Sequence, residues 1–324
     1  MSFPLVQNSA ELSRFRTTLL RWFARNRRPL PWRVSRDPYR IWVSEIMLQQ
    51  TRVAAVLNHY REFLRRFPDV RSLAQASQSA VLAAWSGLGY YRRARAMHAA
   101  AQEILQQRHG VFPASAAEWR HLPGIGRYTA AAIASIAFAE PVAVLDGNVE
   151  RILGRLSGSS SLSRRQAWDL TEKVLSPKRP GDFNQAMMEL GALVCLPGQP
   201  NCPACPISRW CATRGSLGPS AKERRVSKRI AYSLAERNGQ VYLLQRPANA
   251  SLMAGMWELP ECAWDSDTPD FLLRHAITIT DYRVAVYRSA SPVDDRGRWM
   301  RKASLPTIPL TGLARKILRR AGVL

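Results

Sequence analysis

The sequence predicts a mainly α-helical N-terminal region followed by a small α+β domain. Helical hydrophobic periodicity runs from Ser9 to Leu193, where for example Phe15, Leu19 and Phe23 fall on one face. From about residue 229 onward, short alternating segments typical of strands replace it. A chain of 324 residues is long enough for two domains with separate cores. We therefore expect a helical region over 1–215, a linker over 216–228 and a second domain over 229–324.

Periodicity and capping residues place the expected helices of the first region. Apolar residues recur at helical spacing in three further segments: Val53–Phe67, Arg92–Gln107 and Arg164–Leu175. The pair Asp37-Pro38 is typical of a helix start, and Ser115 is placed to cap a short helix before His121.

Turn-forming residues and strand-like patterns predict the structure of the chain after residue 214. Residues 215–225 contain glycine, serine, proline and charged residues with little to bury, which favours an interdomain linker. Beyond it, Ile230–Ala235 and Val241–Leu244 flank Asn238-Gly239, a strong hairpin signal, and Tyr282–Tyr287 alternates like a strand.

The charge balance points to a polyanionic partner. Lys and Arg number 47 against 24 Asp and Glu, a formal net charge of +23 spread over the whole chain. Nucleic acid fits better than a membrane, because the longest apolar run, Ala130–Ala139, is far too short for a bilayer span. The alternative is an arginine-rich composition with a solvated surface and no such partner. We expect a monomer located in the cytoplasm in association with the nucleoid.

The segment Leu122–Ala130 lies between two helical runs and contains Gly124 and Gly126. Two glycines two residues apart allow a tight turn, so that backbone N–H groups of the next helix can approach a phosphate. This is the form of a helix-hairpin-helix, which binds a DNA backbone without reading its sequence. The alternative is an ordinary connection between two helices.

Four of the five cysteines lie close together in the spacing C-x6-C-x2-C-x5-C: Cys195, Cys202, Cys205 and Cys211. Four thiolates from one short loop suit either a 4Fe-4S cluster or a tetrahedral zinc ion. A pair of disulfides is the remaining alternative, but no secretory leader is evident and a reducing cytosol would keep such pairs open.

The hairpin, the run Val144–Val149 and the cysteine spacing follow one another as in the endonuclease III superfamily of base-excision DNA glycosylases, which this chain resembles. Within that superfamily it is similar to the MutY family of adenine DNA glycosylases in three further runs: Leu30–Arg33, Val43–Thr51 and Gly87–Tyr91. The resemblance covers residues from about 20 to 211. It implies a helix-hairpin-helix glycosylase fold, in which a six-helix barrel and an iron–sulfur subdomain flank the DNA-binding cleft. It also implies a 4Fe-4S cluster on the four cysteines.

Two carboxylates are candidates for the chemistry that this resemblance implies. Breaking an N-glycosidic bond requires a proton for the departing base and negative charge beside the sugar cation. Glu45 stands among apolar residues, which favours its protonated form, whereas Asp146 precedes a helical run whose N–H groups favour the ion. The resemblance implies that both reach one adenosine, with Asn148 assisting the water. The alternatives without catalysis are that Glu45 is a solvated side chain and that Asp146 only caps a helix.

The resemblance also assigns the remaining site residues. Relatives that nick the backbone carry a lysine where this chain has Tyr128, which cannot form an imine, so hydrolysis without strand cleavage is expected. Gln50 and Tyr90 match positions that wedge into the base stack during flipping, and Arg28 and Glu189 match positions lining the adenine pocket.

Each of the two tyrosines has a structural alternative. Tyr128 could simply pack the hairpin, and Tyr90 could cap the core beside a glycine turn. Beside Tyr90, Arg92, Arg93 and Arg95 are expected to face DNA.

The C-terminal part departs from the family pattern. Leu243–Pro247 and Leu252–Pro260 resemble the start of the Nudix-like domain that this family uses to inspect the base opposite adenine, without an Arg-Glu-x-x-Glu-Glu metal-binding helix. After His275, the positions that usually hold Phe-Ser-His are occupied by Ile277, Thr278 and Ile279. Thr278 is the candidate for one hydroxyl contact, or the domain only adds basic surface for DNA.

The resemblance implies that the partner is double-stranded DNA containing A:8-oxoguanine or A:G mispairs. Two other functions remain open: a thymine-mismatch or oxidised-pyrimidine glycosylase of the same superfamily, and a catalytically silent iron–sulfur protein that binds DNA lesions.

Overall fold

A computed structural model describes residues 4–159, 162–216, 226–247, 249–250, 252–264, 268–277 and 279–324. By its contacts the chain forms two compact units. The first combines Met1–Gln50 with Glu103–Ser220, and the second combines Thr51–Gln102 with Ala221–Leu324. Most of the expected linker, residues 217–225, lies outside the described residues, so the domain boundaries drawn from the sequence stay a prediction.

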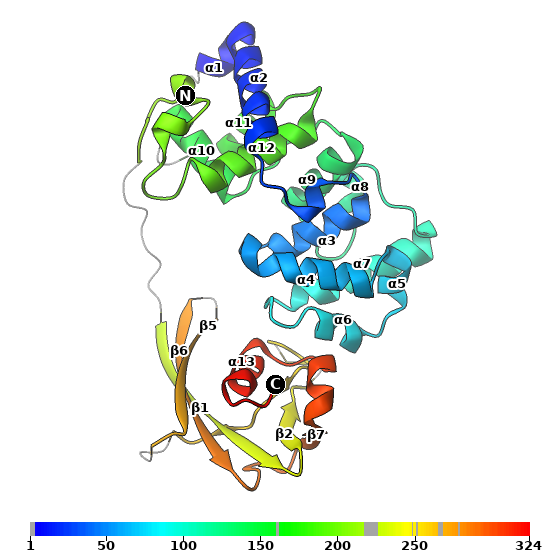
Figure 1. The fold of residues 1–324 in the computed structure, drawn as a ribbon. Coiled ribbons are helices and arrows are strands. Elements are labelled where there is room, and N and C mark those ends of the chain that lie inside the picture. Colours follow the sequence, from blue (N-terminus) through cyan, green and yellow to red (C-terminus); the bar gives the residue numbers. More distant parts are fainter. Residues whose placement is uncertain are drawn as a thin grey trace. The chain divides into compact units, whose positions relative to one another are not determined.

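Helices build the whole N-terminal region, as the sequence predicts (Figure 1). Their bounds are α1 (Pro4–Gln7), α2 (Ser9–Asn26), η1 (Pro31–Arg33), α3 (Pro38–Leu48), α4 (Val53–Arg66), α5 (Val70–Gln75), α6 (Gln78–Ala84), α7 (Arg92–Arg108), α8 (Ala116–Trp119), α9 (Arg127–Phe138), α10 (Gly147–Ser157), α11 (Arg164–Val174), α12 (Pro180–Leu193), η2 (Cys202–Ala204) and η3 (Ser208–Trp210).

The predicted helix starts are confirmed by side-chain caps. The Asp37 carboxylate accepts a hydrogen bond from the Tyr39 N–H at 2.9 Å, at the start of α3. Ser115 forms a capping box with Glu118 on α8. Asp146 caps α10 by accepting from the Val149 N–H at 2.8 Å. These side chains satisfy donors that would otherwise lack partners in the first helical turn.

The first unit has a core in which α2 and α12 pack closely. Phe15 of α2 and Phe183 of α12 are fully buried, with ring centroids 6.3 Å apart, and Trp210 of η3 packs edge-on against Phe15 at 5.5 Å. Glycines permit close approach at two points of α12: a Cβ on Gly181 would lie 2.5 Å from the Ser135 carbonyl oxygen, and one on Gly191 would lie 2.5 Å from the Asn148 Cβ. The helices are therefore fitted to one another at these points.

The second unit contains a seven-stranded sheet in addition to α4, α5, α6 and the start of α7. The strands are β1 (Val226–Arg237), β2 (Gln240–Gln245), β3 (Trp257–Glu258), β4 (Glu261–Cys262), β5 (Phe271–Ile277), β6 (Thr280–Ser289) and β7 (Arg298–Arg301). The order is β3-β2-β1-β6-β5, with β4 paired to β1 and β7 paired to β2.

The predicted hairpin is confirmed, since β1 and β2 pair antiparallel at Arg237 and Gln240 and both turn residues have positive φ, 47° at Asn238 and 71° at Gly239. The expected alternation in β6 is wrong at its centre: Val284, Ala285 and Val286 are all fully buried. There β6 runs parallel to β1, with Ala285 paired to Ala231, so both faces are covered.

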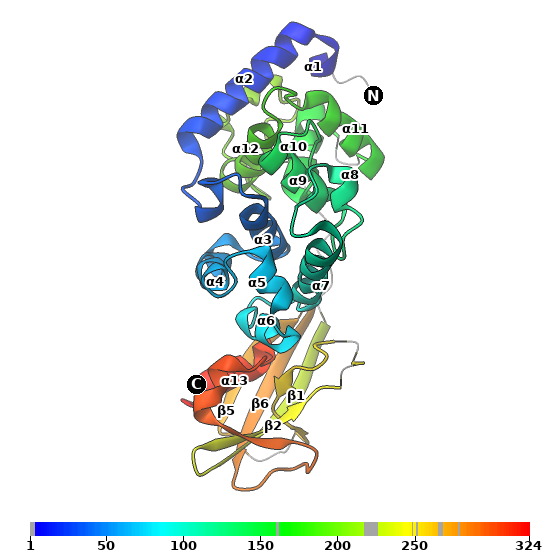
Figure 2. The ribbon, with the colours of Figure 1, turned by 90° about the vertical axis from the view of Figure 1, so that its right-hand side faces the viewer.

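Helix α13 (Gly312–Arg320) packs against this sheet (Figure 2). Leu313, Ile317 and Leu318 share one core cluster with Val241 and Val286. A 3-10 helix, η4 (Lys302–Thr307), leads into α13. The predicted small α+β domain is thereby confirmed. None of the described helices is long and apolar enough to cross a bilayer.

Candidate active site

Glu45 and Tyr128 form the centre of the candidate site in the first unit. Glu45 lies on α3 and is only 7% exposed. The Tyr128 hydroxyl, at the start of α9, donates to Glu45 Oε2 at 3.0 Å and also contacts Met188 Sδ at 3.2 Å. Gln49, the residue that follows α3, donates from Nε2 to Thr129 Oγ1 at 3.0 Å, which joins the end of α3 to the start of α9.

The environment of Glu45 favours its protonated form. Burial raises its pKa from the ordinary 4.5 to about 7. The hydrogen bond from Tyr128 and the charge of Arg33 oppose this shift, while the negative charge of Asp146 adds to it. A carboxyl group with a pKa near the working pH is suited to deliver a proton. Glu45 and Asp146 are thus within electrostatic reach of each other.

Asp146 is held by its own helix and by Asn148. Its Oδ1 accepts from the Val149 N–H, and its Oδ2 accepts from Asn148 Nδ2 at 3.1 Å. Arg151, one turn further along α10, donates to Asn148 Oδ1 at 2.8 Å, to the Gly191 carbonyl at 2.8 Å and to the Cys195 carbonyl at 2.9 Å. Arg151 therefore joins the Asp146 and Asn148 pair to the start of the cysteine loop.

The sequence did not single out Arg151. Its spacing of three residues from Asn148, which puts both side chains on one helix face, is the signal that could have found it.

Arg28 and Glu189 are brought together, and a second arginine joins them. The Glu189 side chain is 1% exposed and accepts from Arg28 Nη2 at 2.6 Å and from Arg33 Nη1 at 2.8 Å. Burial raises the pKa of Glu189, but the hydrogen bonds from Arg33 and Arg28 outweigh it and lower the pKa to about 2. Glu189 is thus an ion, unlike Glu45. Arg33 was named from the sequence only as part of the run Leu30–Arg33. Its bond to Glu189 was not predictable, because the two residues lie far apart in the chain.

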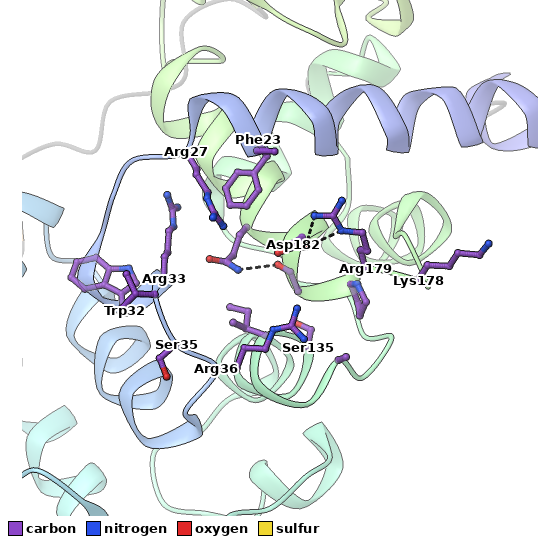
Figure 3. A pocket seen from close by; sticks show the side chains of 17 residues that line it. Phe23, Arg27, Trp32, Arg33, Ser35, Arg36, Ser135, Lys178, Arg179 and Asp182 are labelled. Atoms are coloured by element: carbon purple, nitrogen blue, oxygen red, sulfur yellow. Dashed lines mark hydrogen bonds and ion pairs between the residues drawn. The ribbon is translucent and has the colours of Figure 1, made fainter.

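Arg33 also lines a cavity of about 420 Å³ (Figure 3). Its cationic lining residues are Arg27, Arg33, Arg36, Lys178 and Arg179. Arg179 is paired with Asp182 at 2.7 Å, whereas Arg27, Arg36 and Lys178 have no ion pair with any acid in the described part of the chain. The cavity therefore keeps a net positive charge.

Gln50 and Tyr90 both adopt the left-handed backbone conformation, with φ of 55° and 48°. Such values are uncommon for residues other than glycine and often occur at functional sites. Gln50 is exposed in the first unit, and Tyr90 is 38% exposed in the second. Each is therefore available to contact a ligand.

Of the three arginines beside Tyr90, one is buried, against the expectation that it faces DNA, one is half-buried and one is exposed. Arg93 is 8% exposed and donates to the carbonyls of Leu88 and Gly89, both at 3.3 Å. Arg95 binds the Ala254 carbonyl. Arg92 alone is exposed. The guanidinium groups of Arg93 and Arg95 thus donate hydrogen bonds to backbone carbonyls of neighbouring turns. The spacing of residues in the sequence does not reveal this role.

In the predicted helix-hairpin-helix, the backbone of the turn before α9 is accessible. Gly124 has φ of 73°, and Gly126 caps α9 with no atom within 4 Å of the place where a Cβ would stand. Both glycines are exposed. The first N–H groups of α9 can thus be reached by an anion.

The four predicted cysteine ligands line one small cavity together with Arg155. Arg155 Nη1 contacts Cys195 Sγ at 3.2 Å, and the Arg214 N–H contacts Cys211 Sγ at 3.4 Å. Burial raises the pKa of Cys205 to about 11. Among the described residues, no three His, Cys, Asp or Glu side chains converge closely enough to hold a single metal ion.

Thr278 lies outside the described residues, so its predicted contact is not placed. His275 of β5 is described, and burial lowers its pKa, with the charge of Lys316 acting in the same direction. It lines a cavity with Arg274 and Arg283.

Residues 43–177 match the family model of the HhH-GPD superfamily base excision DNA repair protein. The adenine DNA glycosylase of Homo sapiens is 37% identical over 329 residues, covering 82% of this chain and 60% of the human protein. That of Arabidopsis thaliana is 36% identical, covering 83% of this chain and 50% of the relative. The chain thus spans between half and three fifths of the length of these relatives.

Two solved structures have a similar fold. A thermostable thymine-DNA glycosylase superposes with a TM-score of 0.59 and 29% identity, covering 63% of this chain and 96% of that chain. Endonuclease III in a non-covalent complex with DNA superposes with a TM-score of 0.55 and 20% identity, covering 64% and 96%. The family resemblance seen in the sequence and the helical fold that it implied are both confirmed.

Proposed function

Because residues 43–177 match the family model of HhH-GPD superfamily base excision DNA repair proteins, we propose that the chain is an adenine DNA glycosylase of that superfamily. Its substrate is duplex DNA in which adenine is mispaired with 8-oxoguanine or guanine. The observation that carries the proposal is the pair of unlike carboxyl groups: Glu45 is buried with its pKa raised to about 7, and Asp146 accepts hydrogen bonds as a helix cap. The similarity to curated adenine DNA glycosylases supports the choice of base.

The two groups divide the reaction between them. Glu45 donates its proton to the adenine ring, so that the base leaves as a neutral molecule when the N-glycosidic bond breaks. Asp146 stabilises the positive charge that develops on the sugar. Water then adds to the sugar carbon and gives its proton to the Glu45 carboxylate, which restores the acid, with Asn148 holding the water. Arg151 keeps Asn148 in place through the 2.8 Å hydrogen bond to its side-chain oxygen.

The product is an abasic site with an intact backbone. Tyr128 occupies the position after the hairpin from which a lysine would attack the sugar, and a phenol cannot form an imine. Here the Tyr128 hydroxyl instead donates a hydrogen bond to Oε2 of Glu45, the proposed proton donor.

Recognition involves residues around this centre. The paired Arg28 and Glu189 offer hydrogen-bonding groups to the flipped adenine. Gln50 and Tyr90 enter the base stack where the adenine leaves it, and the hairpin glycines Gly124 and Gly126 bind the DNA backbone. Thr278 contributes a hydroxyl toward the opposite base.

The four cysteines hold a 4Fe-4S cluster. The four cysteines line one small cavity, and four thiolates from one short loop are a ligand set that such a cluster takes. The nearby Arg155 contact at Cys195 Sγ favours the thiolate that ligation needs. When bound, the cluster supplies a structural centre for the loop and no step of the hydrolysis. A visible absorption band lost in the Cys202→Ala variant would distinguish iron–sulfur from colourless zinc.

A single-turnover assay on duplexes carrying A:8-oxoguanine, A:G, T:G or thymine glycol tests the function. We expect adenine release without strand cleavage until alkali is added, and no release by Asp146→Asn. Release of thymine instead would favour the second candidate, to which the similarity with a thymine-DNA glycosylase structure points. Tight binding without any release would indicate a silent lesion-binding protein.

A further inference from the structure

The turn that carries Tyr90 is tied to the C-terminal part of the second unit by a buried hydrogen-bond cluster. Ser86 Oγ donates to the Leu310 carbonyl at 2.9 Å, and the Tyr91 hydroxyl donates to the same oxygen at 3.3 Å. Ser86, Tyr91 and Leu310 are 5%, 4% and 0% exposed. Arg315 of α13 completes the cluster by donating from Nε to Ser86 Oγ at 2.9 Å.

The acceptor of these bonds is itself fixed. Leu310 forms a bridge with Trp257, whose N–H donates to Pro309 and whose carbonyl accepts from Thr311, both within 2.9 Å. Thr311 then caps α13 through its hydroxyl, which accepts from the Ala314 N–H at 3.2 Å. The Leu310 carbonyl is therefore a rigid point of the sheet and helix, and a buried carbonyl without donors would be costly.

The turn between the two donors adopts a backbone that side chains disfavour. Gly87, Gly89 and Tyr90 have φ of 108°, 68° and 48°. The Tyr91 hydroxyl also accepts from the Gly87 N–H at 3.4 Å, so it closes the turn on itself while holding Leu310. Tyr90, directly before Tyr91, is 38% exposed, and its ring centroid lies 5.3 Å from Arg93 Cζ.

We propose that Ser86 and Tyr91 are positioning residues that lock the Gly87–Tyr91 turn onto the Leu310 carbonyl and thereby set the direction of the Tyr90 ring. The C-terminal domain thus contributes to mispair recognition by fixing the orientation of Tyr90. This contribution adds to any contact that the domain itself makes with the opposite base. This inference rests on the proposed function, in which Tyr90 enters the base stack. A ring that is already ordered loses less conformational entropy when it binds DNA.

A double-mutant cycle tests the inference. Dissociation constants for an A:G duplex and a matched A:T duplex are measured by fluorescence anisotropy, with every variant in an Asp146→Asn background that prevents turnover. Tyr91→Phe removes one hydroxyl and should reduce the preference for the mispair about fivefold, the size expected for one neutral hydrogen bond. In a Tyr90→Ala background the same change should alter the preference less than about 1.5-fold, because the positioned ring is gone. Ser86→Ala should follow Tyr91→Phe, with a larger loss.

Tyr242→Phe is the matched control. Its hydroxyl is also buried and hydrogen-bonded, accepting from the Gly297 N–H at 2.7 Å, but it lies on β2 away from the turn. It should melt at a temperature similar to that of Tyr91→Phe and leave mispair preference unchanged. An unchanged preference in Tyr91→Phe, an equal loss in the Tyr90→Ala background, or no effect of Tyr90→Ala itself would each overturn the inference. Failure of the proposed function is recognised separately, by the absence of adenine release from the unmodified protein.

Discussion

The pKa of Glu45 sets the pH range of the proposed reaction. The proton donor is present below about pH 7 and is lost above it. The rate of adenine release under single turnover should therefore fall on the alkaline side, by about tenfold per pH unit once the carboxyl group is ionised. Glu45→Gln should lose about 10²–10⁴-fold in rate. Its affinity for the mispaired duplex, measured in parallel, should be unchanged, and a rate that stays flat to pH 9 would contradict the assignment.

The same buried carboxyl group makes folding stability depend on pH. Its pKa rises from 4.5 in the unfolded chain to about 7 in the folded protein, so the folded state favours the protonated form. Its contribution is complete below pH 4.5 and is lost as pH rises through 7. Glu45→Gln cannot ionise and should be more stable than the parent at pH 8 by up to about 3 kcal/mol, with no such gain at pH 4. Denaturant unfolding at both values measures this difference.

Arg151 connects the site to the cysteine loop, and its loss should be visible in the rate. Arg151→Met removes the donor that holds Asn148 as well as the bond to the Cys195 carbonyl. We expect adenine release to slow at least about tenfold, the value of one charge-assisted hydrogen bond. Arg16→Met is a suitable control, because Arg16 also binds backbone carbonyls, at the end of α11. The control should lose stability while releasing adenine at the parental rate.

At the level of the elements, the contact between α10 and α12 depends on a missing side chain. A Cβ on Gly191 would meet the Asn148 Cβ at 2.5 Å, well inside contact distance. Gly191→Ala should therefore displace Asn148, destabilise the protein by about 1–3 kcal/mol and slow adenine release. Gly312→Ala, at the start of α13, has open space around the added Cβ and should leave stability within about 0.5 kcal/mol. Thermal melting and single-turnover rates on both variants check the contrast.

Local signals predicted individual elements well, because caps and turns act over a few residues. Asp37, Ser115 and Asp146 each cap a helix, and Asn238-Gly239 forms the expected hairpin. Those features depend on hydrogen bonds between near neighbours in the chain. The sequence could not show that β6 would lie parallel to β1 and be buried on both faces, since that pairing joins distant segments.

Motifs in the sequence named candidate site residues, but they did not reveal which residues form hydrogen bonds with one another. Glu45, Tyr128, Asp146 and Asn148 were all named from motifs, and the structure shows two hydrogen-bonded pairs among them, Tyr128 with Glu45 and Asn148 with Asp146. The roles of Arg33 and Arg93 were not predictable. Each binds groups chosen by tertiary packing, a buried carboxylate in one case and turn carbonyls in the other. Long arginine side chains reach across elements, so their partners cannot be inferred from spacing.

At the scale of the whole molecule, the net charge of +23 should dominate affinity for DNA without providing selectivity. Phosphate contacts release counterions, so binding to a matched duplex should weaken by about 10³-fold or more between 50 and 200 mM salt. Binding to an A:G duplex should weaken in parallel, because flipping and base contacts add little further charge neutralisation. The ratio of the two dissociation constants should thus stay within about threefold while each constant changes greatly. Anisotropy titrations at four salt concentrations measure both slopes. A ratio that collapses at high salt would mean that mispair recognition depends on extra phosphate contacts, and that the neutral groups Gln50 and Tyr90 do not provide it.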